Sequence, residues 1–186
     1  YKEEIKQSKE SATCERDENA DFSLMSHQKI VRDYISTFTP YRGLLLYHGL
    51  GSGKTCTSIT IAENLKKEKN IIVMIPASLK NNFIYKGLMY CGDDEYKSNE
   101  EKYKKKYTFV SYNSAYDLKD LKNIGSLDNK VIIIEEVHNL LSIMMSGLDG
   151  SGKLGKELYN LLMNATNTKI IALSGTPIIN DIFEVA

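Results

Sequence analysis

Short apolar runs alternate along this chain with stretches in which apolar residues recur at helical spacing. An unbroken apolar run is typical of a strand buried on both faces, and a spacing of three and four residues is typical of an amphipathic helix. The pattern predicts strands over residues 44–47, 70–75, 108–113, 130–136 and 169–174, and helices over residues 26–38, 55–67, 81–88, 139–145 and 154–166. This alternation predicts an α/β fold with a mostly parallel sheet and helices on both faces.

Polar residues follow three of the predicted strands directly. A glycine-rich segment follows Tyr47, Glu135 and Glu136 end the strand that begins at residue 130, and Ser174 opens a Ser-Gly-Thr turn. Ligands of open parallel sheets bind at the carboxyl ends of the strands. We therefore expect these three segments to meet at one edge of the sheet.

The glycine-rich segment has the order of a phosphate-binding loop, which is a strand, a flexible turn and a helix. Its glycines allow several backbone N–H groups to point at one anion, and the following helix adds positive charge at its N-terminus. Lys54 is expected to reach the β- and γ-phosphates of ATP, and the Thr55 hydroxyl is expected to bind Mg²⁺. His48 stands where the strict pattern has glycine. The predicted phosphate-binding residues are Leu50, Gly51, Ser52, Gly53, Lys54 and Thr55.

The carboxylate pair predicts the chemistry of this edge. Carboxylates seldom follow a buried strand without a function. Glu135 is expected to hold Mg²⁺, and Glu136 to orient and polarise the water that attacks the γ-phosphate. His138 lies two residues further on and is expected to bridge Glu136 to the turn at Ser174 by hydrogen bonds.

Composition limits the other possibilities. The 186 residues have 24 basic and 24 acidic side chains, so any nucleic-acid binding must come from a local groove. The three cysteines, at positions 14, 56 and 91, suggest neither a zinc site nor a disulfide framework, which favours a reduced, intracellular compartment. Residues 1–21 form a polar lead-in, and no apolar run is long enough for a membrane span.

The charged run at residues 93–106 has two interpretations. Such a run is usually a solvated surface insertion. Alternatively, Tyr103 and its neighbouring lysines contact a phosphate backbone.

Six blocks together resemble the first motor domain of superfamily-two helicases, a RecA-like phosphate-loop domain. The resemblance covers residues 22–186 and is stronger to the Swi/Snf-type ATPases than to the DEAD-box helicases. The loop also resembles the version found in large cytoplasmic DNA viruses, of which poxvirus nucleoside triphosphatase I is one type. The blocks are residues 24–28 (LMSHQ), 49–55 (GLGSGKT), 76–80 (PASLK), 109–113 (FVSYN), 135–138 (EEVH) and 174–180 (SGTPIIN).

The resemblance implies roles by position. Gln28 would contact adenine, and Ser174 and Thr176 would couple hydrolysis to domain movement. The cofactors would be ATP and Mg²⁺, and the nucleic-acid partner would be DNA or RNA held by backbone contacts. The implied nucleic-acid contacts are Ser78, Lys80, Ser111, Tyr112 and Asn113.

Two departures from the family pattern bear on activity. The second block normally begins with Asp, and Glu135 is longer by a methylene at a site where Mg²⁺ demands near-ideal geometry. The second motor domain, with its arginine finger, is expected in the full-length protein, and the domain alone is expected to hydrolyse ATP slowly.

Two functions remain open at this point. One is a nucleic-acid-dependent ATPase, either a helicase or a double-stranded DNA translocase. The other is a nucleotide-gated binding subunit of a viral transcription complex, with little stimulated turnover. A viral origin would place the protein in the virion or the host cytoplasm, without a membrane partner.

Overall fold

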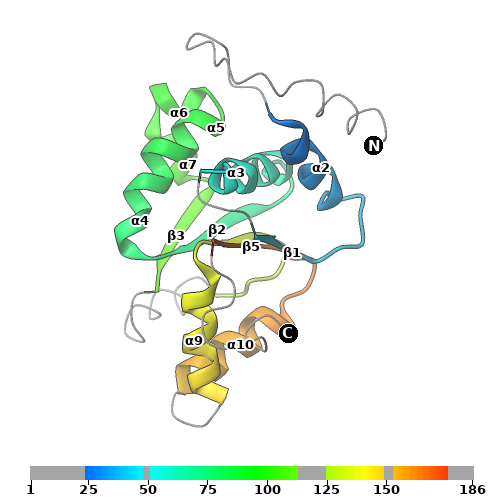
Figure 1. Cartoon of the computed structure of the whole chain (residues 1–186), viewed down its shortest axis with the longest axis vertical. Coiled ribbons are helices and arrows are strands. Elements are labelled where there is room, and N and C mark those ends of the chain that lie inside the picture. The colour runs from blue at the N-terminus through cyan, green and yellow to red at the C-terminus, as the bar shows by residue number, and fades with distance from the viewer. Residues whose placement is uncertain (1–23, 48–50, 113–124, 149–152, 176–186) are drawn as a thin grey trace.

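One five-stranded sheet forms the centre of the protein. The computed structural model describes residues 24–47, 51–112, 125–148 and 153–175. The strand order is β1-β5-β4-β2-β3, and every pair of neighbours is parallel (Figure 1). The predicted α/β architecture is thereby confirmed. The strands are β1 (Gly43–Tyr47), β2 (Asn70–Ile75), β3 (Tyr107–Ser111), β4 (Lys130–Ile134) and β5 (Lys169–Ser174).

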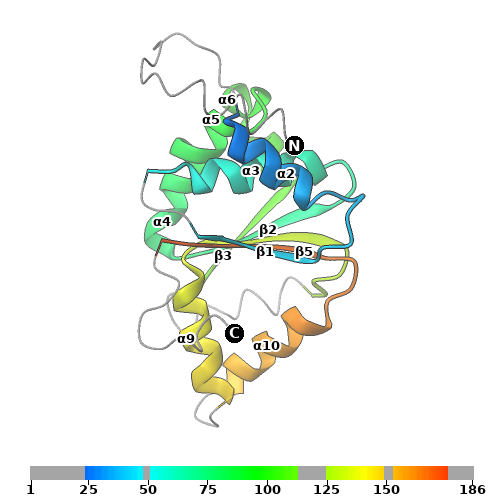
Figure 2. The same ribbon diagram turned by 45° about the vertical axis from the view of Figure 1, so that its right-hand side comes forward.

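Helices cover both faces of this sheet. Figure 2 shows the helices from α2 to α6 above the sheet and α9 and α10 below it. The upper layer has α2 (Ser26–Tyr34), α3 (Lys54–Leu65), α4 (Ala77–Asn82), the π-helix η1 (Phe83–Leu88), α5 (Met89–Cys91), α6 (Glu95–Ser98) and α7 (Glu100–Lys104), and the lower layer has α9 (Val137–Leu148) and α10 (Lys153–Asn164).

Alternate residues of each strand enter different cores. In β2, Ile71 and Val73 pack in the core that contains Ile59 of α3, whereas Ile72 and Met74 pack in the core that contains Leu158 of α10. Successive strand side chains point to opposite faces, so an uninterrupted apolar run supplies both cores at once. This is why the strands were visible in the sequence as continuous apolar runs.

The charged run forms two short helices. Tyr96 of α6 and Tyr103 of α7 are only 4% and 5% exposed and pack in the upper core. Their neighbouring lysines pair with local acids, Lys102 with Glu95 at 2.5 Å and Lys104 with Glu101 at 3.0 Å. Most of the charged residues are exposed, as a solvated surface insertion predicts, while the two tyrosines anchor the segment in the core. The buried Tyr103 ring is not available to a nucleic acid.

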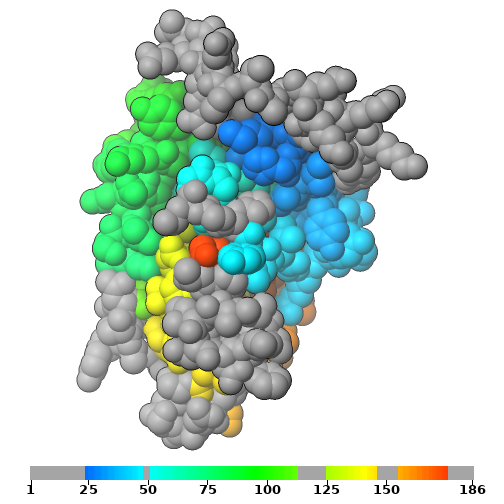
Figure 3. Space-filling view, viewed as in Figure 1, coloured from blue at the N-terminus to red at the C-terminus, as the bar shows by residue number. Residues whose placement is uncertain are grey.

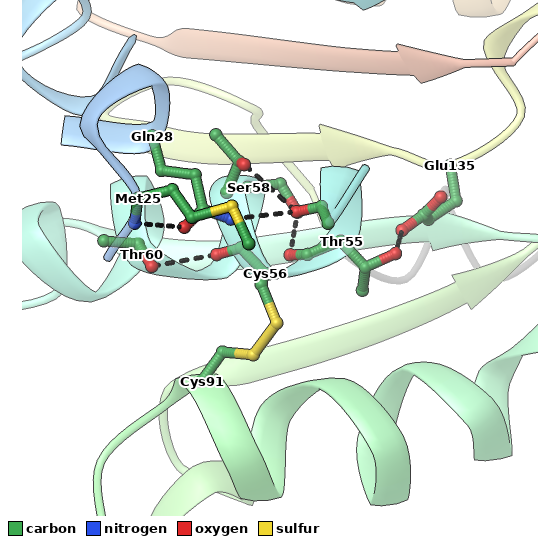
Figure 4. Close-up of a disulfide and its surroundings, with 10 residues drawn as sticks. Met25, Gln28, Thr55, Cys56, Ser58, Thr60, Cys91 and Glu135 are labelled. Carbon is green, nitrogen blue, oxygen red and sulfur yellow. Dashed lines mark hydrogen bonds between the residues drawn. A yellow bond between two sulfur atoms is a disulfide. The ribbon is translucent and has the colours of Figure 1, made fainter. Parts of the chain in front are cut away.

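The expectation that the cysteines form no disulfide was wrong. Cys56 of α3 and Cys91 of α5 are joined by a disulfide, with a Cα–Cα distance of 5.4 Å (Figure 4). The two residues are 35 positions apart, and their pairing depends on helix packing that no cysteine spacing reveals. Among the described residues, no helix is long and apolar enough to cross a membrane.

Candidate nucleotide site

The glycine-rich turn leads directly into α3. Gly51 and Gly53 have φ angles of 78° and 77°, a left-handed conformation that glycine adopts without steric cost. A Cβ atom on Gly53 would also lie 2.9 Å from Nε2 of Gln28. Lys54 and Thr55 form the first turn of α3, where backbone N–H groups and the helix dipole favour an anion.

The neighbouring strands bring the acidic pair to the same edge. Thr55 Oγ1 donates a hydrogen bond of 2.9 Å to Oε1 of Glu135, and Figure 4 shows the two side chains pointing toward each other. Glu135 is 8% exposed. Burial raises the pKa of this carboxyl, the charge of Glu136 adds to the rise, and the Thr55 hydrogen bond and Lys54 oppose it.

The Thr55 and Glu135 oxygens fit a magnesium ion. Lys54 offsets only part of the cost of burying one carboxylate beside another, and a divalent cation would supply further positive charge. Mg²⁺ is usually bound through one or two carboxylates together with substrate phosphates and water. No group of three His, Cys, Asp or Glu side chains gathers in the described parts of the chain.

Glu136 has an unusual backbone for its residue type. Its φ angle is 51°, in the left-handed region that residues other than glycine rarely adopt. Such strain persists only where the surrounding structure holds it, and it often marks a functional turn. The Glu136 side chain is about one-third exposed, so its carboxylate is open to a bound substrate.

His138 lies between Glu136, which follows β4, and the end of the neighbouring strand β5. Its Nδ1 atom lies 3.0 Å from Oγ of Ser174, at the end of β5, and 3.5 Å from Oε2 of Glu136. The hydrogen bond to Ser174 is the half of the predicted bridge that the structure shows, and the Glu136 carboxylate lies at ion-pair distance on the other side. The end of β5 lies beside α9 and the segment around β1 and α3 in the space-filling view (Figure 3).

Tyr112 supports the turn formed by Glu135 and Glu136, which we call the acidic turn. Its hydroxyl donates to the main-chain carbonyl of Glu135 and, at 3.1 Å, to that of Glu136. The residue is 2% exposed, and burial, followed by the two nearby carboxylates, raises its pKa. The Tyr112 side chain is thus committed to the acidic turn, and it does not present its hydroxyl to a nucleic-acid backbone as the family pattern implied.

Gln28 is buried against the phosphate loop. Its Oε1 accepts from the Met25 backbone N–H at 3.0 Å, and its Nε2 donates to the Gly53 carbonyl at 3.4 Å. Only 3% of the residue is exposed. The amide therefore ties α2 to the loop, and an adenine contact would use its remaining donor and acceptor capacity.

A cavity of about 390 Å³ extends from the loop over Glu135 and Glu136 to η1. Its wall includes Asn82 and Lys86, two polar residues that the sequence analysis missed. Single π-turns occur often at functional sites, and η1 is such a turn. Its Gly87 allows close packing on α3, because a Cβ there would lie 3.0 Å from the Thr55 methyl group.

The remaining predicted residues lie apart from this cavity or outside the described residues. Ser78 is exposed on α4, Lys80 lies with its ammonium 5.5 Å from the centre of the Phe109 ring, and Ser111 is half-buried at the end of β3. Their nucleic-acid contacts stay predictions. Leu50, Asn113 and Thr176 lie outside the described residues.

The sheet order, the phosphate loop and the acidic turn define a RecA-like ATPase domain of the helicase type. Residues 21–179 match the family described as "Type III restriction enzyme, res subunit", and the chain belongs to this family. The superfamily-two assignment that the motifs suggested is thereby confirmed.

Several viral proteins are similar to the chain. One protein of Acanthamoeba polyphaga mimivirus, whose name describes an ATP-dependent RNA helicase, is 36% identical over 86% of this chain and 30% of its own length. A termination factor NPH-I homologue of African swine fever virus is 36% identical over 77% of this chain and 21% of its own length. The chain thus spans less than a third of these curated relatives.

A solved structure has the same fold. The Sulfolobus solfataricus SWI2/SNF2 ATPase core in complex with double-stranded DNA aligns with a TM-score of 0.61 at 19% identity. The alignment covers 93% of this chain and 37% of that one. At this identity the likeness concerns the fold alone.

Proposed function

We propose that this chain is the ATP-binding and hydrolysing first domain of a nucleic-acid-dependent ATPase, a helicase or a double-stranded DNA translocase. The observation that carries the proposal is the hydrogen bond between Thr55 and Glu135. It joins the start of α3 to the end of β4 across 80 positions, beside a cavity that Glu136 also lines. These are the groups that phosphoryl transfer to water requires, and its catalysis depends on positioning and charge.

Each side chain has a defined part in this proposal. The loop N–H groups and Lys54 bind the β- and γ-phosphates and stabilise the charge that develops on them. Glu136 accepts a hydrogen bond from the attacking water and directs its oxygen at the γ-phosphorus as the bond to the bridging oxygen breaks. His138 positions Glu136, and it connects the position of this carboxylate to Ser174.

Thr55 and Glu135 are the residues that would hold Mg²⁺. When bound, the ion neutralises charge on the phosphates. The Thr55 hydroxyl and the Glu135 carboxylate already lie within hydrogen-bonding distance of each other, so both oxygens are available on one side of the cavity.

A second function has separate support. The termination factor NPH-I homologue of African swine fever virus is among the similar proteins, which favours a nucleotide-gated binding subunit of a viral transcription complex. In that case, nucleotide binding would change partner affinity while nucleic acid would stimulate turnover little.

Phosphate release by the intact protein separates the two functions. The assay contains Mg²⁺ and ATP, alone or with duplex DNA, single-stranded DNA or RNA. Strong stimulation of phosphate release by one polymer, with the stimulation lost in the Glu136→Gln variant, supports the ATPase and identifies the nucleic acid on which it acts. Tight ATP binding without stimulation by any polymer would exclude the motor function and favour the gated subunit.

A further inference from the structure

Three basic side chains gather at the opposite edge of the sheet from the phosphate loop. Arg42 directly precedes β1, Lys69 directly precedes β2, and Lys169 begins β5. Figure 2 shows the chain entering β1 from α2, and entering β5 from α10, at the same end of the sheet. Strands of five or six residues place this end about 17–20 Å from the nucleotide edge.

The cluster lines a cavity of about 450 Å³. This volume lies in the range of small-molecule sites, and it is slightly larger than the cavity at the phosphate loop. Four connections that lead into strands supply polar groups to its wall. Besides the three cations, these are Thr37, Thr39, Asn129, Asn167 and Thr168. Glu68 is the acidic residue in the wall.

The two lysines are buried without a carboxylate partner. Lys69 is 5% exposed and Lys169 is 8% exposed. No ion pair joins either lysine or Arg42 to an acid among the described residues. Lysine is almost never buried without a partner, because removing a charge from water is costly unless an opposite charge or strong hydrogen bonds offset it.

Main-chain carbonyls satisfy only part of this cluster. Lys69 Nζ donates to Asn167 O at 2.6 Å and to Asn129 Oδ1 at 3.1 Å, and Lys169 Nζ donates to Thr39 O at 2.8 Å and Tyr41 O at 2.7 Å. An ammonium has three donors, so each keeps one.

Arg42 is also only partly satisfied. Its terminal nitrogen donates to the carbonyls of Leu162 and Ala165 at the end of α10, whereas its buried Nε has no hydrogen-bond partner. An unsatisfied buried donor is rare in folded proteins, and here it belongs to a side chain in the wall of the cavity.

The lysines also oppose each other. Burial lowers the pKa of both, although the neighbouring Glu68 raises the pKa of Lys69 in part, and the charge of Lys69 lowers the pKa of Lys169 further. An anion between them would remove this repulsion and accept the free donors.

We propose that Arg42, Lys69 and Lys169 form a second phosphate site, separate from the nucleotide site, for free phosphate or the phosphate group of a small molecule. Tetrahedral phosphate oxygens match several donors that converge from different strands, and the guanidinium edge is well suited to this geometry. The cluster stands at the amino ends of the strands, so a ligand there does not compete with ATP for the loop.

Calorimetric titration of the intact protein tests this site. Orthophosphate and pyrophosphate are titrated at constant ionic strength into a Lys54→Ala background, which weakens phosphate binding at the loop. Lys169→Met is expected to weaken binding about ten- to a hundredfold, as the loss of one charge-assisted bond would. Pyrophosphate binding more tightly than orthophosphate would indicate a larger phosphorylated ligand, and equal binding would indicate free phosphate.

Lys130→Met is the matched control. Lys130 begins β4 at the same end of the sheet, but it donates to Ser126 O at 2.6 Å and does not line the cavity. Its removal is expected to change affinity about fivefold at most, as for an exposed charge. Equal losses in Lys130→Met and Lys169→Met, or no phosphate binding in the Lys54→Ala background, would overturn the proposal.

Crystals of the unsubstituted protein soaked in selenate give an answer that does not depend on any variant folding. An anomalous peak between Arg42, Lys69 and Lys169 is the expected result. A peak at the phosphate loop without one in this cavity would overturn the second site, whatever the ATPase assay shows.

Discussion

Replacing Tyr112 with Phe tests whether the acidic turn is held from below. The hydroxyl is buried and donates to the Glu135 carbonyl, and it also contacts the Glu136 carbonyl, which keeps a second donor in the Asn139 N–H. Its removal therefore leaves the buried Glu135 carbonyl without this donor. The expected loss in the free energy of unfolding is about 1–3 kcal/mol. Because Glu136 occupies a strained left-handed conformation, a looser turn also misplaces its carboxylate, and kcat is expected to fall about ten- to a hundredfold.

Tyr107→Phe is the matched control for this experiment. Tyr107 is likewise a buried tyrosine, 3% exposed, at the start of β3, and its hydroxyl donates at 2.5 Å to Glu63, away from the acidic turn. Its loss is expected to lower stability by about 1.5–3 kcal/mol without changing kcat. Urea unfolding and steady-state phosphate release measure the two effects. If both variants lower kcat equally, the Tyr112 hydroxyl has no special part in positioning Glu136.

Three further changes have defined outcomes. Glu136→Gly removes the left-handed strain and is expected to raise stability by about 1–2 kcal/mol while hydrolysis is lost; a lower melting temperature would contradict the strain. Because the pKa of Glu135 is raised in the folded protein, the free energy of unfolding falls as the pH rises from the ordinary glutamate pKa through the raised pKa. Glu135→Gln should flatten this pH dependence in metal-free thermal melts and raise stability at neutral pH. Dithiothreitol should lower the melting temperature because reduction opens the Cys56–Cys91 loop and lowers the free energy of unfolding by about 4 kcal/mol. In a Cys91→Ser variant, dithiothreitol should cause no such loss.

Much of the nucleotide edge was predictable because it follows from parallel topology. Polar residues after buried strands must meet at one edge, and this rule places Thr55, Glu135 and His138 together from the sequence alone. The contact of His138 with Ser174 was expected from the spacing of His138 after the carboxylate pair, and the pairing of β4 with β5 brings the two residues together.

Other parts depended on packing that sequence spacing does not encode. The sequence does not reveal whether a tyrosine at the end of a strand faces solvent or packs under a turn, so the role of Tyr112 could not be predicted. Lys86 reaches the cavity from a π-helix, whose register departs from ordinary helical spacing. The basic cluster draws on Arg42, Lys69 and Lys169, each of which looks like an ordinary surface residue at the start of a strand.

The position of β1 in the sheet has a consequence for biosynthesis. Among the described strands, the one that carries the phosphate loop pairs with β5 alone, and the partner of Gly43 is Ile170, 127 positions later. A ribosome adding about 5–20 residues per second needs roughly 6–25 s to cover that distance. During this interval the emerging loop has no neighbouring strand to support it, so the nucleotide site is completed late and its unpaired strand is a natural target for chaperones.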